Sequence, residues 1–225
     1  MTRTKLKDRT LPAYTRGEEI ANMVTHIVGG AFGIVALVLS VVKSALYGNA
    51  YLVVGCSIYG AALIFLYTMS SIYHGLLPSL GKKVMQVMDH CTIYFLIGGT
   101  YTPIVLGPIR ELVPWLGWTI FGVVWGVSAL GTVFTAIDHN RFKVLSMLCY
   151  ILVGWVIILA TKSTIDAISL DGFLWLLLGG VMYTIGALLY ILGKKKRIPY
   201  MHSVFHVFVL LGTAFQFISI FAYCI

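Results

Sequence analysis

The stretch Tyr200-Met201-His202-Ser203-Val204-Phe205-His206 opens the last apolar segment of the chain, shortly after a basic run of three lysines and an arginine. Two histidines four residues apart on a helix lie on one face, one turn above the other. At that spacing two imidazoles can hold one metal ion. Serine follows the first histidine, so this is not the zincin pattern, in which a glutamate at that position acts as the general base. We therefore expect other segments to bring a third ligand and a base to this pair.

The composition is that of an all-α polytopic membrane protein. Of 225 residues, 59% are hydrophobic and only 11% are charged, whereas a soluble domain carries about a quarter charged residues. Long apolar runs recur along the whole chain, as in proteins that cross a bilayer with several helices. The net charge of +8 is better explained by basic loops held at the cytoplasmic face than by binding to nucleic acid, which we do not expect.

Seven apolar runs predict seven transmembrane helices within one domain, residues 21–225, preceded by a solvated basic arm, residues 1–20. The runs cover about residues 22–42, 51–72, 84–106, 114–134, 144–160, 172–192 and 200–223. The connecting segments alternate in charge: those on the N-terminal side of the membrane carry thirteen of the sixteen Lys and Arg residues. Because basic loops stay inside, this bias predicts a cytoplasmic N-terminus and an outside C-terminus.

This topology brings four separated polar residues to the cytoplasmic leaflet. His74 ends the second run, Asp89 lies near the start of the third, and His202 and His206 start the seventh. At 1.5 Å per helical residue, Asp89 lies about 9 Å and His206 about 13 Å inside the basic loops. Ionisable side chains at such depth are costly and usually have a function or a partner. Three histidines plus one water are the usual pattern of a catalytic zinc site.

Asp89 and Ser70 are the candidate catalytic residues of this site. Zinc would lower the pKa of a bound water toward about 7 and polarise a carbonyl. Asp89 would accept the proton of that water or hold the water in place. Ser70, one turn before His74 on the same face, would orient a ligand or the water.

A structural interpretation competes with the metal site, because histidines in membrane helices often only hydrogen-bond to neighbouring helices. His90 points about 100° away from Asp89, which makes it a neighbour rather than a ligand. His139, in a loop, is expected to be solvated. A second group at the cytoplasmic edge, which comprises Glu18, Glu19, Asn22 and His26, is expected to be a polar cluster at a helix end, with support of the metal site as the alternative.

Several motifs together resemble a known family. They are the Ser70-xxx-His74 spacing, Asp89 with the following segment 95–103, the final His202-xxx-His206, and Glu18-Glu19 followed by Asn22-xx-Thr25-His26. Over about residues 16–225 the chain resembles the bacterial hemolysin III proteins. These belong to the progestin and adipoQ receptor (PAQR) family, which is grouped with the alkaline ceramidases.

The resemblance implies seven helices with the N-terminus inside and one zinc held by His74, His202 and His206. Asp89 and Ser70 match the positions that contact or position the zinc water. It also implies a multi-pass protein of the cell membrane, here a bacterial inner membrane. Three functions are open: a zinc-dependent hydrolase of lipid amides or esters with a membrane lipid as substrate, a cytolytic or pore-forming protein, and a sensor of membrane lipid composition or energetics with structural zinc.

Overall fold

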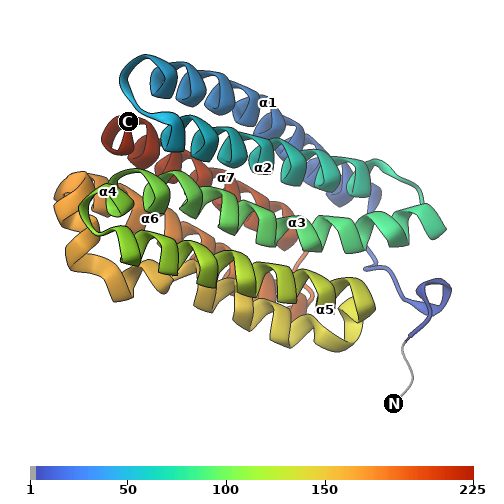
Figure 1. The fold of residues 1–225 in the computed structure, drawn as a ribbon. Coiled ribbons are helices and arrows are strands. Elements are labelled where there is room, and N and C mark those ends of the chain that lie inside the picture. The colour runs from blue at the N-terminus through green and yellow to red at the C-terminus, as the bar shows by residue number, and fades with distance from the viewer. Residues whose placement is uncertain (1–3) are drawn as a thin grey trace.

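The structure is a computed structural model that describes residues 4–225, so Arg3 and the start of the predicted arm lie outside the described residues. Within that range the chain is helical and contains no strand, as the composition predicts. The elements run nearly parallel or antiparallel to one another (Figure 1). They are α1 (Arg16–Tyr47), α2 (Ala50–Gly75), α3 (Leu80–Ile104), α4 (Arg110–Leu112), α5 (Pro114–Gly154), α6 (Thr161–Lys196) and α7 (Met201–Ser219), with short turns of 3-10 helix at Leu6–Asp8 and Val156–Ala160 and of π-helix at Val105–Ile109 and Ile220–Cys224.

Five helical segments of the described residues are long and apolar enough to cross a membrane, where the sequence predicts seven runs. The difference arises in residues 114–196, which form one helical segment of 83 residues. That length is several times the roughly 20 residues that span a bilayer. The predicted apolar runs themselves fall in α1, α2, α3, both ends of α5, α6 and α7.

Helix α5 folds back on itself at Asp138, whose dihedral angles (φ −157°, ψ 89°) are not helical. The side-chain oxygens of Thr135 and Ser146 lie 2.9 Å apart, although eleven residues of straight helix would separate them by about 16 Å. The yellow part of the ribbon in Figure 1 accordingly turns at this point and runs back beside the first arm.

A second reversal lies within α6, where Ser169 adopts a left-handed conformation (φ 64°). Trp155 and Thr184, almost equally distant from Ser169 along the chain, are joined by a 3.1 Å hydrogen bond from the indole Nε1 to Oγ1. The two reversals divide residues 114–196 into three helical arms.

Small residues let α1 and α2 approach closely. A Cβ atom on Gly29 would lie 2.5 Å from the ring of Tyr67, and one on Gly33 would lie 3.2 Å from Leu63. The four-residue spacing of these glycines indicates a close helix contact, and α2 is the partner that the structure supplies. The close contact at these two glycines fixes the rotation of α1 about its axis, so the buried face of α1 includes Asn22 and His26.

One end of the bundle gathers four segments that are distant in sequence. There the N-terminal segment meets the first turn of α3 at Lys83, whose Nζ donates to the Lys7 carbonyl. It also meets the turn of α5, where Nη2 of Arg9 donates to the Ile137 carbonyl at 2.8 Å. The α6–α7 turn joins the same end, since the Tyr200 amide donates to Glu18. The N-terminal segment is therefore not a fully solvated arm, because Arg9 is only 3% exposed.

Candidate metal centre

The turn between α6 and α7 sets the direction of the two α7 histidines. Arg197 and Tyr200 both adopt left-handed conformations (φ 55° and 60°), which end α6 and start α7 within four residues. The Tyr200 amide donates to the Glu18 carboxylate at 2.9 Å, which holds the start of α7 against the start of α1. His202 and His206 then lie in the first two turns of α7, as the sequence predicts.

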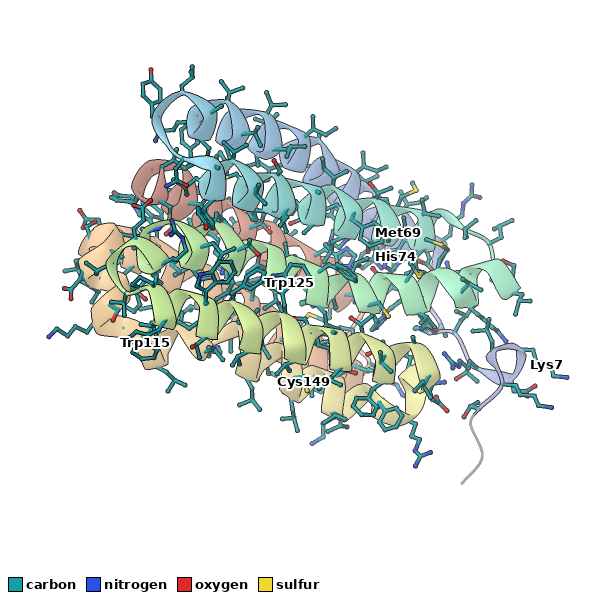
Figure 2. All side chains as sticks on the ribbon, viewed as in Figure 1. Lys7, Met69, His74, Trp115, Trp125 and Cys149 are labelled. Atoms are coloured by element: carbon teal, nitrogen blue, oxygen red, sulfur yellow. The ribbon has the colours of Figure 1, made fainter. Side chains whose placement is uncertain are left out.

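His74, in the last turn of α2, meets this pair across the bundle. One ring nitrogen from each of His74, His202 and His206 lies within 4.8 Å of the other two. His74 and His206 are buried, and His202 is half-buried. Figure 2 shows His74 among the helices, in the half of the molecule that ends at Lys7. The structure thus brings together the three histidines that the sequence predicts as ligands.

Glu19 determines which nitrogen His74 presents. Its Oε2 lies 2.6 Å from Nδ1 of His74, while the Asn22 amide lies farther from the same nitrogen, at 3.4 Å. The shorter contact, to a charged acceptor, is the stronger one, so Nδ1 carries the proton and donates to Glu19. Nε2 of His74 is therefore left with a free lone pair, and it is buried without a hydrogen-bond partner.

His206 is oriented in the same way by α1. Its Nδ1 lies 3.2 Å from the Asn22 carbonyl and 3.2 Å from Oγ1 of Thr25. A carbonyl can only accept, so Nδ1 carries the proton and Nε2 is the free acceptor nitrogen. The Asn22 side chain in turn accepts a 2.6 Å hydrogen bond from Ser203, which ties α1 to the middle of the histidine pair.

The donor set fits a metal ion that prefers nitrogen ligands. Three imidazole nitrogens suit Zn²⁺, and the fixed Nδ1 protons leave Nε2 of His74 and of His206 as acceptors, as in carboxylate–histidine–zinc arrangements. The buried, unpartnered Nε2 of His74 supports the same conclusion, because leaving such an atom unsatisfied costs about 1–3 kcal/mol. Nδ1 of His202 is also buried without a partner. These residues therefore fit a metal ion.

The two predicted catalytic residues lie at different positions relative to the three histidines. Ser70 is fully buried one turn before His74, and its Oγ has no hydrogen-bond partner. Asp89, on α3, directs Oδ2 to Nδ1 of His90 at 3.5 Å. Asp89 is not part of the group whose ligand atoms lie within 4.8 Å, and the carboxylate that touches a ligand histidine is Glu19.

Three of the four residues of the polar cluster predicted at the edge line this centre, in keeping with the alternative that the cluster supports the site. Glu19 and Asn22 contact the ligand histidines, and the His26 ring stacks on the His206 ring at 3.5 Å between centroids. A sequence signal for this existed: counting back from Gly33 and Gly29 in steps of three or four residues reaches His26, Asn22 and Glu19, all on one face of the helix.

Two further residues at the centre lack any such signal. Lys82 is buried and donates to Glu19 at 2.6 Å and to the Leu76 carbonyl at 2.8 Å. Tyr14, which precedes α1, stacks on His202 with ring centroids 5.2 Å apart and planes inclined by 19°. No periodicity relates these positions to the histidines in the sequence.

The remaining histidines form a separate pair. The rings of His90 and His139 lie 4.0 Å apart between centroids. Nδ1 of His90 donates to the Gln86 carbonyl at 2.8 Å, in keeping with the prediction that His90 is a neighbour. The expectation that His139 is solvated is wrong, because the reversal of α5 presses it against His90 and leaves it half-buried.

Comparison with known proteins identifies related chains over almost the whole length. The family model described as "Haemolysin-III related" matches residues 14–217. The chain is 38% identical to "Hemolysin-3 homolog" of Bacillus subtilis (94% of this chain, 97% of the relative) and 36% identical to "Hemolysin-3" of Bacillus cereus (92% and 91%). It is also 28% identical to the human "Monocyte to macrophage differentiation factor" (92% and 84%), a match consistent with the predicted relation to the PAQR family.

The apolar helices and these matches agree on the cellular location. Bacterial members of the family are membrane proteins, and the long apolar helices described above are those of a multi-pass protein of the cell membrane. The family match covers all three clustered histidines and spans most of the chain. The chain therefore belongs to the haemolysin III-related family.

Proposed function

We propose that this protein is a zinc-dependent membrane hydrolase that cleaves amide or ester bonds of lipids. The observation that carries the proposal is the buried Nε2 of His74, which Glu19 keeps unprotonated at the meeting point of three imidazoles. A structural zinc site usually has four protein ligands, whereas three histidines leave a coordination position for a substrate or water.

We also propose seven membrane crossings with the N-terminus in the cytoplasm, and residues 21–225 as one domain after an arm of residues 1–20. The two reversals in residues 114–196 support the count, because each helical arm there would cross once. The gathering of Lys83, Arg9 and the α6–α7 turn at one end supports the orientation, since basic segments stay inside. The metal centre would then face the cytoplasmic leaflet.

Each residue of the centre has a proposed task. His74, His202 and His206 would hold the zinc, which when bound supplies a Lewis acid that polarises a substrate carbonyl. Ser70, with its free hydroxyl, would donate a hydrogen bond that orients the substrate, and Asp89 would accept a proton from the attacking water. Burial of His74 and His206 keeps these two ligands away from bulk water, which strengthens the electrostatic interactions around them.

The test combines metal analysis with turnover. Purified protein in lipid nanodiscs is analysed for zinc by mass spectrometry and incubated with a panel of ceramides and glycerolipids. We expect about one zinc per chain, none in His202→Ala, and retained zinc but abolished hydrolysis in Asp89→Asn. Full turnover by zinc-stripped protein would contradict the proposal. Zinc retained without turnover of any amide or ester would instead favour a structural or sensory metal.

Lysis is the second candidate function, because the relative from Bacillus cereus is named Hemolysin-3. A pore would not need the histidine cluster. Equal leakage of dye-loaded liposomes with wild-type protein and with the His202→Ala/His206→Ala variant would favour this alternative over the hydrolase.

A further inference from the structure

The segment before α1, residues 4–15, crosses the end of the bundle at which the three histidines lie. We call it the strap. It includes the 3-10 turn Leu6–Asp8 and ends at Thr15, which caps α1. Its path is set by contacts with three parts of the chain that are far apart in sequence, namely the reversal of α5, the start of α3 and the start of α7. A tethered segment of this kind, lying across a site, can control access to it.

The N-terminal part of the strap, residues 4–9, is anchored to the α5 reversal and to α3. The Thr4 amide donates to Oδ2 of Asp138 at 2.9 Å. Arg9 is only 3% exposed, and its Nη2 donates to the Ile137 carbonyl. Lys83 donates to the Lys7 carbonyl. Only Nη2 of this buried guanidinium is hydrogen-bonded, whereas Nε and Nη1 are buried without a partner, so Arg9 is held by its burial and by the bond to Ile137 rather than lying on the surface.

The near part of the strap lies on the metal centre itself. Tyr14 stacks on His202, and its ring centroid is 6.0 Å from that of His74, so one phenol covers two of the three histidines. The ring of Tyr190 also lies beside His202, with centroids 5.1 Å apart.

Hydrogen bonds also hold the junction between the strap and α1. Thr15 and Glu18 form a capping box, in which Oγ1 of Thr15 accepts from the Glu18 amide and the Glu18 carboxylate accepts from the Thr15 amide. The same carboxylate accepts from the Tyr200 amide at the start of α7. These hydrogen bonds hold Tyr14, the residue before Thr15, close to His202, which follows Tyr200 by two residues.

We propose that the strap closes the metal centre on its aqueous side, with Tyr14 as the covering residue and Arg9 as the anchor. This rests on the proposed function, which supplies the metal and the cytoplasmic orientation. With the strap in place, water-soluble compounds are kept from the three histidines, and lipid substrates reach them from the bilayer. Release of the strap opens the centre to water and lets polar products leave.

The test measures how fast bound zinc is removed by a water-soluble chelator, 4-(2-pyridylazo)resorcinol, from the full-length protein in nanodiscs. Tyr14→Ala should release zinc roughly two- to tenfold faster, the range expected from an aromatic pair. Arg9→Ala, remote from the metal, should accelerate release about tenfold or more. Tyr14→Phe keeps the ring, and Lys5→Ala removes an exposed charge from the same segment, so both should match wild type.

Wild-type release rates in Tyr14→Ala and in Arg9→Ala, with one zinc bound per chain, would overturn the strap while leaving the proposed function intact. Hydrogen exchange of the metal-free protein is an independent readout. The amides of Thr4, Asp8 and Arg9 are hydrogen-bonded and should be protected in wild type but not in Arg9→Ala. Unprotected exchange of these amides in wild type would refute the strap even if the protein bound no metal.

Discussion

Replacing Glu19 by glutamine tests the tautomer argument at the metal centre. Glutamine keeps the size of the side chain and an oxygen that can accept from Nδ1 of His74, but it removes the charge. A hydrogen bond to a charged group contributes about 1.5–3 kcal/mol and a neutral one about 0.5–1.5 kcal/mol. The difference of roughly 1–1.5 kcal/mol predicts zinc binding weakened about tenfold, and Glu19→Ala, which removes the acceptor, about a hundredfold.

The same change also leaves Lys82 without its carboxylate. The Lys82 side chain is 4% exposed, and removing one member of a buried ion pair costs about 3–5 kcal/mol of folding free energy. Lys82 keeps its hydrogen bond to the Leu76 carbonyl, so we expect the lower end of that range. The double variant Glu19→Gln/Lys82→Met should recover most of the stability but none of the zinc affinity, because the His74 contact is still to a neutral amide.

Zinc affinity is measured by competition with a chelating indicator in detergent, and stability by thermal unfolding of the metal-free protein. Glu111→Gln makes the same chemical change at an exposed carboxylate that contacts Asn49 and no histidine, so it controls for the loss of charge. If Glu19→Gln bound zinc within twofold of wild type, Glu19 would not be what presents Nε2 of His74 to the metal.

Two further predictions concern the fold around the centre. Gly131→Ala would place a Cβ 2.2 Å from the Tyr94 ring and should destabilise the folded protein by about 1–3 kcal/mol, measured by thermal unfolding. Gly126→Ala on the same helix is the control, because its Cβ would meet nothing within 4 Å and should leave stability unchanged or slightly raised. Equal effects of the two variants would contradict the close α3–α5 contact. Asp138→Ala removes the acceptor for the Arg141 amide and should lower the stability of the fold by about 1 kcal/mol in the same assay, while Asp138→Asn should lower it little. An Asp138→Ala variant as stable as wild type would mean that this carboxylate does not stabilise the reversal.

Local spacing was enough to predict much of this molecule. Four residues separate His202 from His206 and Ser70 from His74, so each pair shares a helix face in any tertiary arrangement. The apolar runs predicted an all-helical membrane protein, and the charge alternation predicted that His74 lies at the same end as the α7 pair. These inferences depend only on helix geometry and on the cost of burying charge, both of which can be evaluated along the chain.

The partners of the ligands depended on packing. Glu19 touches the ligand His74 because of how α1 rotates against α2, and that rotation is set by Gly29 and Gly33 closing on Tyr67 and Leu63. A rotation of one residue, about 100°, would turn Glu19 away. The sequence placed both carboxylates at the correct end, but spacing along the chain could not distinguish them.

The strap lay furthest from what a sequence can predict. Arg9 and Tyr14 belong to an irregular polar segment, and their partners are the Ile137 carbonyl and the His202 ring, more than a hundred residues away. Every residue has a backbone carbonyl, so the sequence does not identify Ile137 as the acceptor for Arg9. The turn that exposes this carbonyl forms only when α5 folds back. The sequence by itself therefore determined which residues can bind a metal, whereas the tertiary structure decided which groups orient and cover them, because those contacts join surfaces that exist only after the helices pack.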